Sequence, residues 1–242
     1  MTEAISRNEL RRQLGLIEEV RIGFRFVKQG LHEVDQIRPG NDFYHPPILF
    51  LSMGLERILK CMICMHHKIN HGSYPTHYDK LWPQSNKGHD LVFLKEQVVG
   101  FCVELSGQDY TDDYRLLTTD HRVNGLLKLL SEYGMNSRYF NLNALLRRPG
   151  DSDPMSEYDR FTWQLAHLIH GGKLMELLAS PANSNEAYVL MNKELKGLVE
   201  RITRALARQF IHGAIKDEAR RFLVDLQPFY QITDTDLGMH SY

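Results

Sequence analysis

Apolar residues that recur at steps of three and four constrain the fold of this chain more than any other feature of its sequence. The first series comprises Leu10, Leu14, Ile17, Val20, Phe24, Val27, Leu31 and Val34. Steps of this size place side chains on one face of an α-helix, so the series predicts a long amphipathic helix at about residues 6–36. Pro39 and Gly40 follow this series, and we expect them to end the helix.

The same spacing continues through the rest of the chain. Pro46 and Pro47 suit the first turn of a second helix at about residues 46–70, where their missing N–H groups cost nothing. Further series predict helices within residues 91–105, 123–133, 154–174, 188–210 and 216–230. The sequence has no sustained alternation of period two. We therefore expect an all-α fold, an antiparallel helical bundle of about six to seven helices in a single domain, residues 1–242.

The sequence marks the start of the third helix clearly. Residues 88–91 read Gly-His-Asp-Leu and directly precede the third apolar series. A carboxylate at a helix start can accept backbone N–H groups and opposes the positive end of the helix dipole. We therefore expect Asp90 to cap this helix.

The charge balance and the cysteine content exclude several classes of protein. Lysine and arginine number 29 against 30 aspartate and glutamate, so any nucleic-acid site must be a local patch. Three cysteines are too few for the disulfide framework of a small secreted protein. No apolar run approaches the ~20 residues that span a bilayer. We expect a cytoplasmic protein without membrane contact.

Two pairs of arginine and histidine residues are candidates for catalysis. Arg208 and His212 are four positions apart, and Arg160 and His167 are seven apart, so each pair shares one side of its helix. Histidine can transfer a proton near neutral pH, and arginine can stabilise charge on phosphorus. This combination suits cleavage of a phosphodiester without a metal. The alternative is a chance spacing, and the apolar neighbours of His167 favour a structural histidine there.

A row of cations precedes His212. Arg201, Arg204 and Arg208 recur at steps of three and four, which predicts a basic ridge along one side of the helix. Phosphate backbones bind to such ridges, so Arg201 and Arg204 are candidate nucleic-acid contacts. A solvated face without a ligand is the alternative.

Potential metal ligands gather in one further segment. Cys61 and Cys64 are followed by His66, His67 and His71. A structural zinc site draws on two separated ligand pairs, and the sequence has no second cysteine pair. The motifs of nucleoside triphosphatases, dinucleotide enzymes, zinc proteases and serine hydrolases are also absent. We therefore predict no metal and no cofactor, and a metal-dependent enzyme that uses residues 61–77 is the weakest hypothesis.

Four short segments follow one another in a recognisable order. They are FLSMGLERILK (Phe50–Lys60), GHDL (Gly88–Leu91), SRYF (Ser137–Phe140) and RQFIHGAI (208–215). This order resembles the HEPN superfamily, the helical domains found in many prokaryotic toxin and antiphage systems. The likeness covers about residues 46–148 and 200–216, within a HEPN-like core of about residues 46–216.

The resemblance implies a function as well as a fold. Active members carry an arginine and a histidine separated by four to six residues, commonly with a polar residue after the arginine. Arg208 and His212 enclose three residues with Gln209 next to the arginine, whereas Arg160 and His167 enclose six without a polar residue in that place. In the family two copies of this helix meet, so the resemblance implies a homodimer. It also implies RNA as substrate and an antitoxin-like protein as partner.

Two main functions remain open after these observations. The first is a metal-independent endoribonuclease in which His212 or His167 acts as acid or base and Arg208 or Arg160 steadies the phosphate. The second is a non-catalytic helical module that binds a nucleotide, RNA or a protein. The two are separated by whether an arginine and a histidine of one pair line a shared cleft that is open to solvent.

Overall fold

Helices account for 78% of the residues that the computed structural model describes, which are 6–77, 81–82, 88–103, 107–135, 137–146 and 153–242. These residues form eleven α-helices and no strand, and their one β contact is an isolated bridge between Arg38 and Asn41. The all-α class predicted from the sequence is confirmed, with more helices than the six or seven expected. None of the described helices is both long enough and apolar enough to cross a lipid bilayer.

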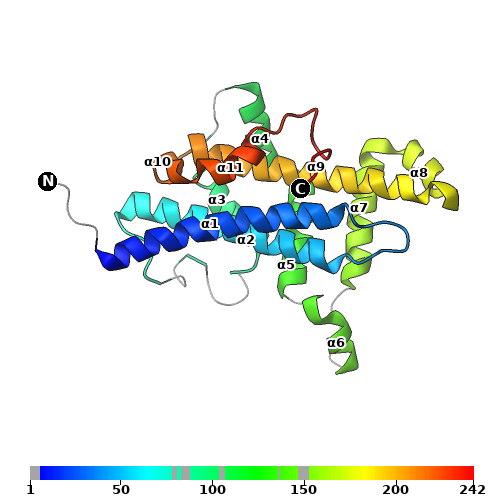
Figure 1. Ribbon diagram of the computed structural model, residues 1–242, viewed down its shortest axis with the longest axis horizontal. Helices are drawn as coiled ribbons and strands as arrows, with labels where there is room; N and C mark the ends of the chain where they lie inside the picture. Colours follow the sequence, from blue (N-terminus) through cyan, green and yellow to red (C-terminus); the bar gives the residue numbers. More distant parts are fainter. Residues whose placement is uncertain (1–5, 78–80, 83–87, 104–106, 136, 147–152) are drawn as a thin grey trace.

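The first two predicted helices form an antiparallel hairpin (Figure 1). α1 covers Arg7–Val34 and α2 covers His45–His71, close to the ranges that the apolar spacing predicts. The two backbones approach closely at a glycine of α2, where a Cβ on Gly54 would lie 2.8 Å from the backbone nitrogen of Val27 and 2.9 Å from the carbonyl oxygen of Gly23. A side chain of any size at Gly54 would push the two helices apart.

The long helix α9 (Ser184–His212) packs against this hairpin and against helices from the rest of the chain. Its neighbours include α4 (Gln108–Thr119), α7 (Pro154–His170) and α11 (Leu223–Tyr230). The ring of Phe24 in α1 lies 6.2 Å from that of Phe210 in α9 and 5.7 Å from that of Phe229 in α11. One buried cluster thus joins the two ends of the chain.

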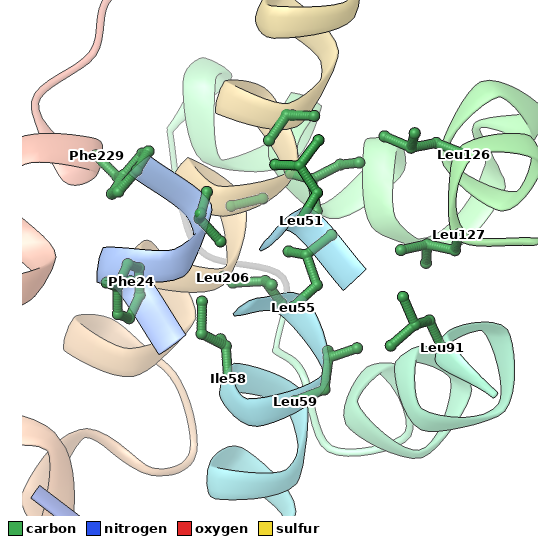
Figure 2. Close-up of a cluster of buried hydrophobic side chains, with 14 of the residues drawn as sticks. Phe24, Leu51, Leu55, Ile58, Leu59, Leu91, Leu126, Leu127, Leu206 and Phe229 are labelled. Carbon is green, nitrogen blue, oxygen red and sulfur yellow. The ribbon is translucent and has the colours of Figure 1, made fainter. Parts of the chain in front are cut away.

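The other side of α2 is covered by α3 (Leu91–Val99) and α5 (His121–Met135). Figure 2 shows the leucines of α2 facing those of the two covering helices. The residues involved are Leu51, Leu55 and Leu59 of α2, Leu91 of α3, and Leu126 and Leu127 of α5. All six are at most 1% exposed. Burial on opposite sides explains why the sequence of α2 is richer in apolar residues than that of α1.

The predicted cap of α3 is confirmed. The Asp90 side chain accepts a hydrogen bond from the backbone N–H of Phe93 at 3.0 Å, and the backbone of Asp90 is extended, as an N-cap residue requires. The helix ends at Val99, before Leu105, which we expected at its end and which lies outside the described residues.

The sequence predicts no helix over α4, because only a few apolar residues interrupt its polar sequence QDYTDDYRLLTT. The predicted fifth helix is divided into α7 and α8 (Gly172–Leu178), because Gly171 between them has a φ of +42°. Shorter helices complete the chain: η2 (Ser137–Tyr139), α6 (Phe140–Leu145), η3 (Pro181–Asn183), α10 (Lys216–Ala219) and η4 (Arg220–Phe222). Of these, η2 and α6 lie in a stretch that we expected to be a connector.

Candidate functional site

The arginines and the histidine that the sequence singles out on α9 lie along its contact with α4. At one end, Arg201 lines a shallow surface hollow together with Arg115 of α4. At the other end, the ring of His212 lies 5.6 Å from that of Tyr110, near the start of α4. The helix that sequence reasoning missed therefore lies beside the whole row of candidate residues.

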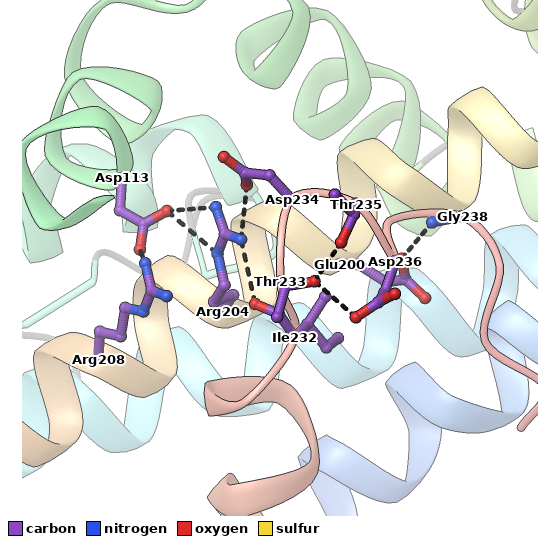
Figure 3. A network of polar contacts seen from close by, with 10 residues as sticks. All are labelled: Asp113, Glu200, Arg204, Arg208, Ile232, Thr233, Asp234, Thr235, Asp236 and Gly238. Carbon is purple, nitrogen blue, oxygen red and sulfur yellow. Dashed lines mark hydrogen bonds and ion pairs between the residues drawn. The ribbon is translucent and has the colours of Figure 1, made fainter. Parts of the chain in front are cut away.

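The middle of this row is buried and neutralised (Figure 3). Arg204 donates to Oδ1 of Asp113 from Nη2 at 3.0 Å and to Oδ1 of Asp234 from Nη1 at 2.7 Å. The second oxygen of Asp113 pairs with Arg208, so two carboxylates balance two guanidinium groups. Arg204 is 4% exposed and Arg208 is 9% exposed. The exposed ridge expected from the spacing is therefore not present at these two arginines, because other parts of the chain cover that face of α9.

His212 lies at the exposed end of α9 and bonds to two tyrosines in series. Its Nε2 lies 3.0 Å from the hydroxyl of Tyr230, and that hydroxyl lies 3.1 Å from the hydroxyl of Tyr110. The hydrogen bond with Tyr110 and burial raise the pKa of Tyr230, so its hydroxyl keeps its proton. Arg208 lies over the ring of Tyr110, 5.1 Å from its centroid. Tyr110 thus contacts both members of the predicted Arg208 and His212 pair.

The structure does not bring the second pair together around a cleft. Arg160 forms an exposed ion pair with Glu157 and borders a cavity of about 400 Å³ between α5 and α7. His167 does not line that cavity, and its ring stacks on that of Trp163 at 4.7 Å. Its Nδ1 is buried and has no hydrogen-bond partner among the residues that the structure describes. The pair therefore shares a helix without sharing a site.

The cysteine and histidine segment shows no metal centre within the described part of the chain. No three histidine, cysteine, aspartate or glutamate side chains there come together as ligands would. Burial raises the pKa of Cys64 to about 11, so its thiol stays protonated and a poor ligand. The histidines make other contacts: His66 stacks on Phe101 at 4.1 Å and His67 stacks on His71 at 4.2 Å.

A larger cavity, of about 670 Å³, lies along α2 and is called the α2 cavity below. One wall comes from α1, with Arg12, Leu16 and Glu19, and the others come from segments that surround α2. From α2 itself it is lined by Ser52, Met53, Glu56, Arg57, Lys60, Cys61 and Cys64, and from elsewhere by Tyr74, Pro75, His89, Gly134 and Arg138. Its size is typical of pockets that hold a small organic ligand.

Positive charge exceeds negative charge around the α2 cavity. Two of its cations are paired: Arg57 with Glu19, and Lys60 with Glu56 at 2.6 Å. His89 also lies 3.0 Å from Glu56 through Nδ1, so this carboxylate has two partners. The remaining two cations, Arg12 and Arg138, are exposed, and neither has an ion pair with any described residue.

Sequence reasoning did not find the α2 cavity. Arg12, Arg57 and Arg138 come from three separate helices, and only the fold brings them to one cavity. The one available signal was the spacing of Glu56, Arg57 and Lys60, which places three charges within about one turn in the middle of α2, between apolar stretches. A buried helix with such a charged segment indicates an opening to solvent there.

The chain was also compared with known proteins. No protein-family model, no curated protein and no solved structure matches it significantly.

Proposed function

We propose that this protein binds a phosphate-bearing nucleotide, free or within an RNA strand, in the α2 cavity. The observation that carries the proposal is the charge of the cavity wall, where four cations face two carboxylates. A phosphate group would find the guanidinium groups of Arg12 and Arg138, which no described carboxylate occupies. Guanidinium groups bind phosphate oxygens through two parallel hydrogen bonds.

The apolar part of the same cavity suits the rest of a nucleotide. Leu16, Met53 and Tyr74 line it beside the charged groups. Ligand pockets typically combine such apolar walls with a few polar groups that fix orientation. A base or ribose against these side chains, with the phosphate at the arginines, would use both parts of the cavity.

Arg12→Ala and Arg138→Ala are each expected to weaken nucleotide binding about tenfold, since a hydrogen bond to a charged group contributes roughly 1.5–3 kcal/mol. Binding is measured by titration calorimetry with a nucleoside 5′-monophosphate and, separately, with a short single-stranded RNA. Arg11→Ala is the matched control, because Arg11 is the exposed neighbour of Arg12 and does not line the cavity. Equal losses from Arg11→Ala and Arg12→Ala, or no binding of either ligand by the wild type, would contradict the proposal. Stronger binding of the RNA than of the mononucleotide would identify the strand as the ligand.

A metal-independent endoribonuclease at Arg208 and His212 is the second candidate, favoured by their shared contact with Tyr110. The exposed His212 would act as general acid or base, and Arg208 would steady the phosphate. This candidate is weaker, because Asp113 already pairs with Arg208, and neither Arg208 nor His212 lines the α2 cavity or the cavity between α5 and α7. This candidate includes the proposed kinship with HEPN proteins, and with it a homodimer and an antitoxin-like partner.

His212→Ala should reduce RNA cleavage in EDTA at least ~10²-fold if this candidate holds, because that is the usual effect of removing a general acid or base. His32→Ala serves as control, since His32 is an exposed histidine of α1 far along the chain from the row on α9. His167→Ala tests the other pair in the same assay. If all three variants cleave RNA at the rate of the wild type, or if the wild type does not cleave RNA, the endoribonuclease candidate is contradicted and nucleotide binding remains the proposed function.

A further inference from the structure

The C-terminal tail after α11, residues 231–242, returns along α9 and is held there by buried charges (Figure 3). The backbone N–H of Gly238 donates to Glu200, which is fully buried. Lys196, only 4% exposed, donates to the carbonyl oxygen of His240 at 2.7 Å. The carbonyl oxygen of Ile232 also accepts a hydrogen bond from Nη1 of Arg204 at 3.2 Å, so the tail is anchored on α9 on both sides of residues 233–236.

Arg201, Arg204 and Arg208 of α9 are called the arginine row below. Between α11 and Gly238, the tail brings one carboxylate into contact with this row. Oδ1 of Asp234 accepts a hydrogen bond from Nη1 of Arg204 at 2.7 Å. Burial raises the pKa of Asp234, but the hydrogen bond from Arg204 and the charges of Arg204, Arg201 and Arg208 outweigh it and lower that pKa below its usual value. The positive charges of three arginines of α9 thus stabilise the ionised form of one carboxylate from the tail.

The Asp234 side chain itself remains open to solvent. It is 62% exposed, whereas the side chain of Arg204 beneath it is 5% exposed. The surrounding turn is bonded within itself, through Thr233 to Thr235 at 2.8 Å and through Thr233 to Asp236. Residues 233–236 are thus an exposed turn between the anchors at Ile232 and Gly238.

We propose that Arg201, Arg204 and Arg208 form a binding site for the phosphodiester backbone of nucleic acid, and that Asp234 occupies this site as a tethered anion. Carboxylates and phosphates accept the same paired hydrogen bonds from guanidinium groups, so a phosphate can replace Asp234 without new donor geometry. When Asp234 leaves, the row gains one positive charge, next to Arg201. The proposal is independent of ligand binding in the α2 cavity.

Asp234→Asn is expected to bind a labelled single-stranded oligonucleotide of about ten residues roughly tenfold more tightly than the wild type. Fluorescence anisotropy at several salt concentrations measures both the affinity and its salt dependence. The logarithmic slope should steepen by about one, since one more phosphate contact releases one more counterion. Arg201→Ala introduced into the Asp234→Asn chain should reverse most of the gain.

Asp236→Asn is the matched control, because it removes the same charge from the same turn at a residue that bonds to Thr233. It should change the affinity less than twofold. Equal gains from the two variants would overturn the proposal, since overall charge would then explain both, as would an unchanged affinity in a folded Asp234→Asn protein. Arg138→Ala in the Asp234→Asn background separates the two sites: the gain should persist, and its loss would place the strand in the α2 cavity instead.

Discussion

Gly54→Leu is expected to lower the free energy of unfolding by about 3 kcal/mol or more, because overpacking a close contact between two helices leaves no side chain that can yield. A Cβ at this position would meet the backbone nitrogen of Val27 at 2.8 Å and the carbonyl oxygen of Gly23 at 2.9 Å. Both atoms belong to the backbone of α1, so the two helices must separate. The gain of about 1 kcal/mol in helix propensity from replacing glycine cannot offset that separation.

Gly15→Ala provides the control for this experiment. Gly15 lies in the interior of α1, and a Cβ there would have no neighbour within 4 Å. The substitution should therefore stabilise the protein, by roughly 0.5–1 kcal/mol, through helix propensity alone. Urea unfolding followed by circular dichroism measures both variants. A loss smaller than about 1 kcal/mol for Gly54→Leu would show that α1 and α2 do not approach as closely as described.

The close contact at Gly54 gives a physical reason for the glycine in one of the segments that carry the resemblance. Gly54 is the small residue within FLSMGLERILK, the segment that resembles a HEPN signature. Its physical role is to admit the backbone of α1, and that role can be tested whether or not the kinship holds. The surrounding helices were predictable because the apolar spacing of α1 and α2 is regular over many turns.

The surroundings of the candidate residues were less predictable from the sequence. Helical spacing shows that Arg204 and Arg208 share a face, but it does not show which segment covers that face. Their partner Asp113 lies 91 and 95 positions earlier in the chain, on α4, whose mostly polar sequence has too few apolar residues to form a series like those of the other helices. The same limit applies to the α2 cavity, which Arg12 of α1 and Arg138 of η2 line together only in the folded chain.

Asp113→Ala is expected to cost about 3–5 kcal/mol of stability, the usual loss when one partner of a buried ion pair is removed. The side chain of Asp113 is 6% exposed, and it pairs with both Arg204 and Arg208. Burial disfavours the charged form of Arg204, but Asp113 and Asp234 outweigh this effect and raise its pKa. Arg204 therefore stays charged, and without Asp113 its one remaining anionic partner in the described part of the chain is the exposed Asp234.

Asp112→Ala is the matched control for this substitution. Asp112 is the adjacent residue of α4, its side chain is 52% exposed, and it lies 3.8 Å from Arg115. Exposed pairs of this kind contribute at most about 1 kcal/mol, so urea unfolding should separate the two variants clearly. If Asp113→Ala does not fold, the triple change of Asp113→Leu, Arg204→Met and Arg208→Met should restore a folded protein, because apolar side chains can replace a buried ionic network.

The loss of stability in Asp113→Ala also tests whether the guanidinium groups of Arg204 and Arg208 are buried or exposed to water. A loss of several kcal/mol would mean that Arg204 and Arg208 are held within the protein by Asp113, so that only the Asp234 side of the row can open to a phosphate. A loss below about 1 kcal/mol would mean that water already solvates both guanidinium groups, as for an exposed pair. The row would then be the open basic ridge that the spacing of Arg201, Arg204 and Arg208 first predicted, and Asp234→Asn would add little to its affinity for nucleic acid.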